Sequence, residues 1–538
     1  MDGLVFQLFS PDLFDIIAKY LIQFDIISLS RTCKSINTIA NTYLYRSITL
    51  NSNYSQFEKE YTKEQTTYIR TRANFTLLLK SLNRNSYNDS NLRKLVKVLK
   101  IEDLPLDFYD FESCLLGKTA DSLSFFRRGC LTKLYLTSPI SFSVLKYLLS
   151  DEYSRRNLSL LCFTVNKYAN VKSVLSLVED PKLKFENLST LSIGPLKPDL
   201  GVNLPLVLIP DDKKQMLESL KLIYYHHALR LADLASFSEN NLILENSIFR
   251  TLSFYKNLKE LCLQSINLNL EIHTSDLNER ENFEIFSNLT YLELTDVSLV
   301  GSDMNQSILH KLYQYSKVCR LRRVQLDISS ISNDLIPDFF LFQVKENQIL
   351  EFDVTIRHNC MHTIPLNELI EKYIHYIIFR QKGSLRKLSV EIKCERNLVS
   401  LGGQLQRVHI AQILSKEFLN LRSLRLEADF DSILELKDKL FLNMPNLENL
   451  WVVGSNAVPV HFGLGNMHPG IYDSWWRIID LPKSLVKNVS KHPLRYIKIH
   501  KYLFIVLDEG ERERVQPKDT IDKIFEGLTR VSFLQSST

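Results

Sequence analysis

The chain has 538 residues, of which 45% are hydrophobic and 24% charged, an ordinary composition for a soluble globular protein. Its 66 basic and 61 acidic residues leave a net charge of +5, a surplus too small to predict nucleic-acid binding. The eight cysteines are scattered without CxxC pairs, which predicts reduced thiols and a cytoplasmic or nuclear location. No basic signal region opens the sequence and no long apolar run occurs, so we expect no membrane insertion.

The first segment with a clear pattern is residues 9–50, which we expect to form three short helices. Apolar side chains at Leu13, Phe14, Ile17 and Leu21 have the spacing of one face of an amphipathic helix. Further apolar runs follow after Asp25, ending near Ile48. Three helices of this length cannot bury all of their apolar faces against one another. The segment therefore predicts a surface that needs a partner.

Residues 9–50 resemble an F-box. The matching positions, in order, are Asp12, Leu13-Phe14, Ile17, Tyr20-Leu21, Asp25-Ile26 and Cys33-Lys34. Two positions depart from the family pattern: Phe9-Ser10 stands where Leu-Pro is usual, with Pro11 one position later, and Ile36 replaces the common Trp. The resemblance implies docking to a Skp1-like adaptor protein. The implied contact residues are Phe9, Pro11, Leu13, Phe14, Ile17, Leu21, Ile26, Leu29, Cys33 and Ile36.

From residue 96 onward, one phrase recurs: Asn or Ser, Leu, two residues, Leu, one residue, then an apolar residue. Composition alone would produce roughly one such match in a chain of this length. The seven matches are NLSLLCF (157–163), NLSTLSI (187–193), NLKELCL (257–263), NLTYLEL (288–294), SLRKLSV (384–390), NLRSLRL (420–426) and NLENLWV (446–452). Degenerate copies raise the total to about fourteen units between Val96 and Leu528, with a mean period of about 33 residues. They lie at 96–101, 131–136, 217–223, 321–326, 349–354, 494–499 and 528–533.

The phrase resembles the strand of a leucine-rich repeat. Its apolar residues alternate around polar ones, so each unit predicts a short strand with one face inward. A single unit cannot bury that face, and successive units are therefore expected to stack. The intervening residues are expected to return mostly as helices, as in DSILELKDKLFLN (431–443). Many such repeats carry a later Asn that bonds the turn, but here the position holds Leu196, Ile266 or Val297, so the repeats are irregular.

The predicted fold class is α/β, with an N-terminal three-helix F-box followed by an irregular leucine-rich-repeat solenoid that has a parallel strand face. We expect residues 1–50 to form the helical module, 51–95 a connector and N-terminal cap, and 96–538 the solenoid. The polar stretch 51–67 contains no Gly or Pro, which favours a structured join over a flexible tether.

No pattern of residues predicts catalysis, a metal site or a cofactor. His358, Cys360 and His362 alternate, but no second Cys/His pair lies nearby to complete a zinc site. No GxGxxG, GxxxxGK[ST] or GxSxG motif occurs. We therefore expect that the protein is not an enzyme.

The best candidate for recognising a partner protein is a long segment near the C-terminal end of the repeats. The long segment 454–482 carries Tyr472, Trp475, Trp476 and Arg477, side chains that often anchor interfaces but that could equally cap the solenoid. Trp451 lies within a repeat phrase, where inward-pointing Leu450 and Val452 would turn it to the opposite face.

Phosphate recognition would need clustered arginines on adjacent strands. Arg320, Arg322 and Arg323 form the only dense run, and the sequence does not fix its register.

The resemblance implies a substrate-recognition adaptor of an SCF-type ubiquitin ligase, which would bind Skp1 directly, a cullin indirectly, and an unknown protein substrate through the repeats. An alternative shares every feature of the sequence. In that alternative, the protein is a Skp1-bound regulator outside the ligase, for example one that sequesters a Rab-type small GTPase or scaffolds a complex.

Overall fold

The computed structural model describes about half of the chain. The described residues are 16–18, 21, 23–51, 66–69, 71, 73–78, 95–103, 131–140, 152–165, 184–196, 208–224, 255–265, 267–269, 288–300, 320–328, 340–341, 344–358, 366–394, 411–427, 430–453, 481–485, 494–499, 502–506 and 515–518. They belong to two compact units: residues 1–227 with 247–258, and residues 228–246 with 259–538.

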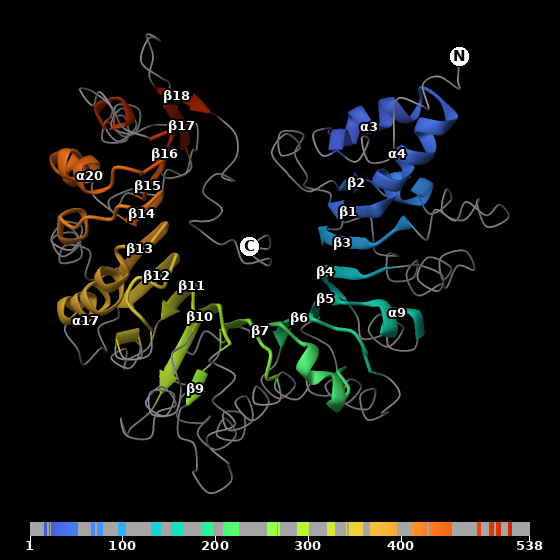
Figure 1. Ribbon diagram of the computed structural model, residues 1–538, viewed down its shortest axis with the longest axis horizontal. Coiled ribbons are helices and arrows are strands. Elements are labelled where there is room, and N and C mark those ends of the chain that lie inside the picture. The colour runs from blue at the N-terminus through green and yellow to red at the C-terminus, as the bar shows by residue number, and fades with distance from the viewer. Residues whose placement is uncertain are drawn as a thin grey trace, which may run out of the picture. The chain divides into compact units, whose positions relative to one another are not determined.

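The first unit combines two N-terminal helices with a parallel sheet (Figure 1). Its described elements are α3 (Gln23–Ser30), α4 (Lys34–Arg46), β1 (Ser47–Asn51), β2 (Thr67–Ile69), β3 (Val98–Asp103), β4 (Lys133–Ile140), α9 (Glu152–Asn157), β5 (Leu160–Val165), β6 (Thr190–Leu196), the short helix η4 (Asp211–Met216) and β7 (Ser219–Tyr224). The strands pair in the order β2-β1-β3-β4-β5-β6-β7, and every pairing is parallel.

The second unit continues the same strand pattern. Its described elements are β8 (Glu260–Gln264), β9 (Asn267–Asn269), β10 (Tyr291–Val300), β11 (Arg323–Ile328), β12 (Glu351–His358), α17 (Leu366–Lys372), η6 (Tyr373–Ile378), η7 (Phe379–Gln381), β13 (Lys387–Cys394), β14 (Ser423–Glu427), α19 (Phe430–Glu435), α20 (Lys437–Asn443), β15 (Asn449–Val453), β16 (Tyr496–Ile499), β17 (Tyr502–Val506) and β18 (Val515–Lys518). Strands β8 and β10–β16 are parallel neighbours, and β9 lies beside the end of β10. Strands β17 and β18 add antiparallel pairs at one edge.

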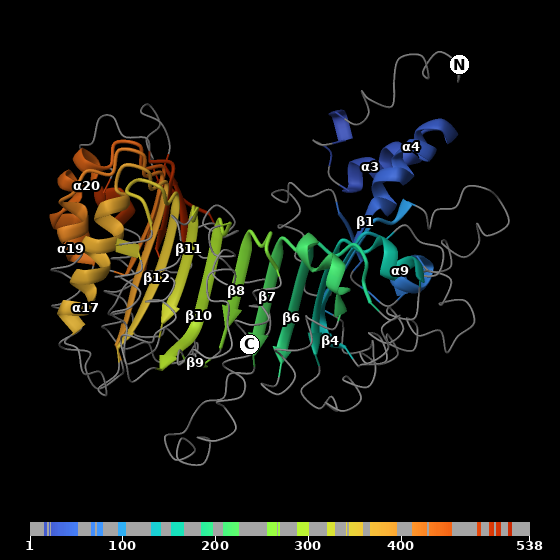
Figure 2. The same cartoon turned by 60° about the horizontal axis from the view of Figure 1, so that its bottom comes forward.

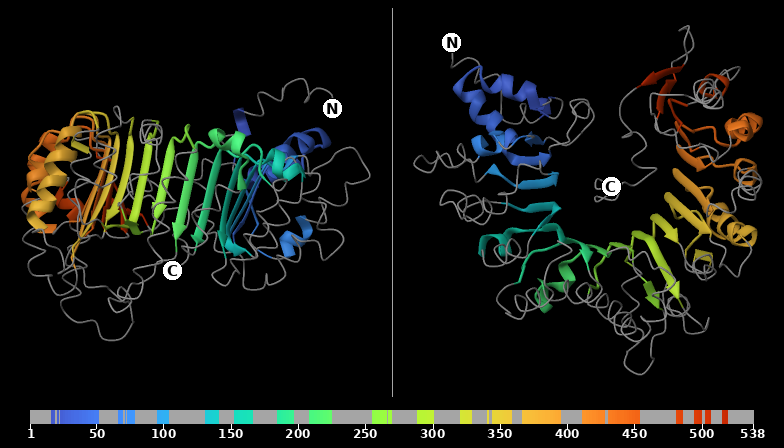
Figure 3. Two further views of the ribbon diagram at one scale, coloured as in Figure 1. Left: turned by 90° about the horizontal axis from the view of Figure 1, so that it is seen from below. Right: turned by 180° about the vertical axis from the view of Figure 1, so that it is seen from behind.

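Alternation along each strand separates an apolar face from a polar one. In β14, Leu424 and Leu426 are buried in the core, while Ser423 and Arg425 alternate with them on the opposite face, where neighbouring side chains also cover them. The apolar face packs against the returning helices α17, α19 and α20 (Figures 1 and 2). The polar face of the second unit is covered by no helix among the described residues (Figure 3).

The segment α17–η6–η7 shows why a return helix forms here. Its buried side chains follow the spacing i, i+3, i+4, i+7, i+8, which is the stripe of an amphipathic helix lying on a core. They are Ile370, Tyr373, Ile374, Ile377 and Ile378. Each such apolar side chain contributes roughly 1.5–3 kcal/mol when it leaves water.

A main-chain ladder fixes the register at each described step within a unit. Where a strand begins, two successive amides donate to one carbonyl of the preceding strand's start; Arg422 and Ser423, for example, both donate to Arg386 O at 2.8 and 3.0 Å. Arg386 and Lys387 in turn donate to Leu350 O. Equivalent residues therefore stand in one row across the strands.

The leading asparagine of the recurring phrase bonds one repeat to the repeat before it. Asn420 Nδ2 donates to Gly383 O at 2.6 Å, and Asn446 Nδ2 donates to Leu419 O at 2.7 Å. Asn187 and Asn257 make the same kind of bond to main-chain carbonyls of the preceding repeats. The acceptor is a carbonyl in the turn before the preceding repeat's strand. The ladder amides do not donate to this carbonyl, because they bond a later residue at the start of that strand. This explains why the phrase so often opens with Asn.

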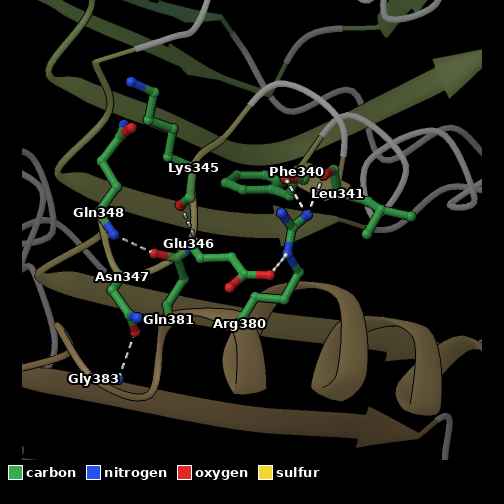
Figure 4. Close-up of polar contacts among 9 residues, drawn as sticks. All are labelled: Phe340, Leu341, Lys345, Glu346, Asn347, Gln348, Arg380, Gln381 and Gly383. Atoms are coloured by element: carbon green, nitrogen blue, oxygen red, sulfur yellow. Dashed lines mark hydrogen bonds and ion pairs between the residues drawn. The ribbon is translucent and has the colours of Figure 1, made fainter.

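A polar network joins η7 to the turn before β12 (Figure 4). Gln381, only 2% exposed, accepts from the amides of Gln348 and Ile349 at 2.7 and 2.9 Å and donates to Lys345 O. Asn347 has a φ of 55° and accepts from the Gly383 amide at 2.8 Å. A Cβ on Gly383 would lie 2.6 Å from Asn347 Oδ1, so a larger residue would have to displace the exposed Asn347 side chain and its hydrogen bond.

The α/β class and the parallel strand face predicted from the sequence are confirmed. All seven full copies of the phrase coincide with strands, and so do the degenerate copies from 96 to 499. The copy at 528–533 lies outside the described residues. The helical return predicted at 431–443 is present as α19 and α20. The predicted three-part division stays a prediction; its boundary at residue 50 falls inside β1.

We predict that removing one rung of the asparagine ladder costs about 1 kcal/mol of unfolding free energy, the usual net value of one hydrogen bond. Asn420→Ala and Asn446→Ala should each lower stability by this amount in urea denaturation. Asn37→Ala, at an exposed position of α4 where the side chain only accepts from Asn41, should change stability by less than half as much. Equal effects of all three would contradict a special role for the ladder.

Candidate functional site

The N-terminal helices form a small core with an incompletely covered apolar side. Ala18, Ile26, Ala40 and Tyr43 are buried together. Partly buried apolar side chains surround them, namely Leu21, Leu29, Ile36, Ile39 and Leu44. Ile16 remains 55% exposed. The module thus keeps apolar surface that its own helices do not bury.

The implied Skp1-binding residues fall into three groups. Phe9, Pro11, Leu13 and Phe14 lie outside the described residues. Ile26 is buried in the core of the module. The half-buried members are Ile17, Leu21, Leu29, Cys33 and Ile36. Their docking role stays a prediction, as does the first of the three helices, of which only the turn 16–18 is described.

Helix α4 passes directly into the sheet. It ends at Arg46, and β1 begins at Ser47 with no intervening residue. Arg46 O accepts from the Lys97 amide at 2.9 Å, and Leu44 O accepts from the Thr67 hydroxyl. β1 then pairs with both β2 and β3. The module is therefore hydrogen-bonded to the first strands instead of hanging on a linker.

A stack of charged and aromatic side chains occupies the polar face of the second unit. Register aligns Ser389, Arg425, Trp451 and Lys498 in one row across β13–β16. Arg425 Cζ lies 4.6 Å and Lys498 Nζ 3.7 Å from the ring centroid of Trp451. Cations at these distances from an indole are attracted by its π-electrons, more strongly when water is excluded.

Arg425 also neutralises a nearby carboxylate. Its Nη2 donates to Glu391 Oε2 at 2.9 Å, and its Nη1 donates to Ser389 Oγ at 3.3 Å. Both charged side chains of this pair are almost buried. A pair so placed has its desolvation offset only while both partners remain, so Glu391 and the indole together fix the guanidinium.

Asp353 lies on β12 beside Ser389, the first residue of this row. Neighbouring groups offset the negative charge of its carboxylate only in part. Burial raises the pKa of its carboxyl to about 7, and the charges of Glu391 and Asp327 act in the same direction. A hydrogen bond with Ser389 and the charge of Arg425 lower that pKa only in part. The guanidinium is instead engaged by Glu391. Asp353 is therefore a titratable group near neutral pH, held among buried side chains on the polar face of the sheet.

The corresponding row of the first unit has a different character. It runs Lys100, Tyr135, Cys162, Ser192 and Lys221 across β3–β7. Lys100 Nζ lies 5.2 Å from the Tyr135 ring centroid. Burial raises the pKa of the Cys162 thiol, with Ser192 and Lys221 opposing it, so the thiol is no activated nucleophile.

Trp451 lies on the polar face, as its position in the phrase predicts, since Leu450 and Val452 are fully buried on the other face. It is nevertheless only 9% exposed, because the two cations cover its ring. Sequence reasoning missed Asp353, Arg425 and Lys498. The signal was available as charged residues at the alternate position of three phrases, but only the register brings them together.

Tyr472, Trp475, Trp476 and Arg477 lie outside the described residues. Within the part of the chain that the structure describes, no three His, Cys, Asp or Glu side chains are grouped so that they could hold a metal ion. No described helix is both long and apolar enough to cross a membrane.

Comparisons with known proteins assign no family. No family model and no curated protein matches the chain. Among solved structures, it is similar to the crystal structure of the Rad7 and Elc1 complex in yeast, with 16% identity and a TM-score of 0.32 over 76% of this chain and 100% of that chain. A similarity at this level does not establish a function.

Asp353→Asn should stabilise the protein above neutral pH. In the unfolded chain Asp ionises near pH 4. In the folded chain it ionises near pH 7, so stability falls as pH rises through this window. The shift corresponds to at most about 4 kcal/mol. Urea denaturation should show the variant more stable than wild type at pH 8 and similar at pH 4. A difference independent of pH would contradict the assignment.

Trp451→Phe should preserve the stack that Trp451→Ala removes. We expect the alanine variant to lose about 3 kcal/mol of stability and the phenylalanine variant about 1 kcal/mol, because a benzene ring retains a π face and most of the packed volume. Thermal unfolding of both variants measures this. Equal losses would show that the indole packs without attracting the cations.

Proposed function

We propose that the protein is a substrate-recognition adaptor of an SCF-type ubiquitin ligase. The N-terminal helices dock onto a Skp1-like adaptor, which links the protein indirectly to a cullin, and the sheet selects a partner protein. The chain performs no bond chemistry itself and acts in the cytoplasm or nucleus. The observation that carries the proposal is the helical module, which keeps uncovered apolar surface and is bonded directly to the sheet.

The uncovered surface supports a protein partner at the module. Ile16 is exposed, and five apolar side chains beside the small core are only partly buried. Grouped apolar surface of this kind typically marks an interaction site. The match of this segment to the F-box pattern makes a Skp1-like protein the expected partner.

The direct join supports an adaptor role in particular. Because α4 runs into β1 and both are hydrogen-bonded to the next strands, a protein bound to the helices would be held directly on the sheet of the first unit. Such tethering raises the local concentration of one bound protein near the other. A flexible linker would weaken that effect.

Co-expression with a Skp1-family protein and size-exclusion chromatography test the proposal. We expect a stoichiometric complex with wild type and loss of it for Leu13→Asp/Ile17→Asp, because two buried charges would oppose docking. Thr38→Asp, at an exposed site of α4, should retain the complex. No complex with wild type would contradict the proposal.

Cullin co-purification then separates the two roles open from the sequence. A cullin that elutes with the wild-type complex supports the ligase role. A complex that binds Skp1 but never a cullin supports a regulator outside the ligase.

A further inference from the structure

The edge at which the strands of the second unit begin carries an ordered row of arginines. The main-chain ladder places one residue per strand in this row, since each amide donates to the carbonyl of the residue before it in the row. The successive members, from β11 to β16, are Arg322, Leu350, Arg386, Arg422, Glu448 and Arg495. Four of six are arginine, and we call these four the arginine row.

All four side chains are exposed. Arg422 Nη1 lies 3.8 Å from Glu448 Oε1, a loose ion pair between an exposed guanidinium and a half-buried carboxylate. Within the described chain, Arg322, Arg386 and Arg495 form no ion pair. Exposed Arg320 and Lys382 precede the row at β11 and β13 and add to its charge. Three of the four guanidinium groups in the row are therefore paired with no carboxylate of the residues that the structure describes.

This charge is not a general property of the repeat. The same ladder position in the first unit holds Arg46, Lys97, Thr132, Ser159, Ser189 and Glu218, two cations and one anion, with a single arginine. The whole chain has a net charge of only +5. The arginines are concentrated at one edge of one unit.

Spacing sets the size of a fitting ligand. Neighbouring strands lie about 4.8 Å apart, so the five steps from Arg322 to Arg495 span about 24 Å. An extended peptide covers that distance with about seven residues. Guanidinium groups bind carboxylates and phosphates through paired hydrogen bonds, and here they recur at one- and two-strand intervals.

We propose that the arginine row binds an extended acidic segment of the partner protein, whose carboxylate or phosphate groups pair with successive arginines. The inference rests on the proposed function in that it names the chemistry of the selected partner. It adds what the sequence alone leaves open, because Arg322 now has a register that aligns it with arginines far along the chain.

Fluorescence anisotropy with three labelled octapeptides tests the row. The peptides alternate Gly with Glu, with phosphoserine or with Gln. We expect wild type to bind at least one anionic peptide, more weakly as salt rises, and to ignore the Gln peptide. The double variant Arg386→Gln/Arg422→Gln should bind the anionic peptide at least tenfold more weakly than wild type does. Which anionic peptide binds more tightly identifies carboxylate or phosphate as the group recognised.

A control variant removes two positive charges elsewhere, one of them the ion-paired Arg156. Arg156→Gln/Lys439→Gln alters exposed residues of α9 and α20 outside the row and should bind like wild type. No anionic binding, equal loss in this control, or tighter row-dependent binding of an eight-nucleotide oligothymidylate would overturn the proposal. Skp1 complex formation by the same variants is scored separately. Loss of the Skp1 complex would count against the adaptor role. A retained Skp1 complex without peptide binding would count only against peptide binding by the arginine row.

Discussion

The structure depends on the lateral hydrogen bonding of one strand start to the next. A strand of five or six residues with two buried apolar side chains has no stability alone, because ordering its backbone costs more than that burial returns. Stacking joins the apolar faces into a continuous core, and the ladder of paired amides on one carbonyl sets the register. The asparagines that open the phrase reinforce the same step from the turn side.

Register is also what turns scattered charges into surfaces. Arg425, Trp451 and Lys498 are far apart in sequence, yet the alignment of β14, β15 and β16 puts both cations against one indole. The same alignment leaves Asp353 without a committed cation, because Glu391 holds the guanidinium. Three residues before Arg425 and Lys498, just ahead of the strands, it produces a row of exposed arginines. Residues that face the core must stay apolar on every strand, so they cannot vary in this way.

The strands and their faces could be predicted because local alternation decides them. The role of the leading Asn could not, since its acceptor lies in a different unit. Nor could the pairing of Arg425 with Glu391, which requires the register of β13 against β14. The extent of α17–η7 escaped prediction as well, because its stripe of Ile and Tyr residues reads equally as a buried strand over short windows. In the helical module, the pattern predicts a partner-binding segment but could not separate Ile26, which the core buries, from its half-buried neighbours.

We propose that the chain binds two proteins through separate surfaces. An adaptor binds the N-terminal helices, and a selected partner binds the second unit. Hydrogen–deuterium exchange of the full chain, with and without a saturating Skp1-family protein, tests this most directly. The account predicts added protection confined to peptides within residues 9–50, with the amides of β8–β16 unchanged. Protection along β8–β16, or none within 9–50, would contradict it.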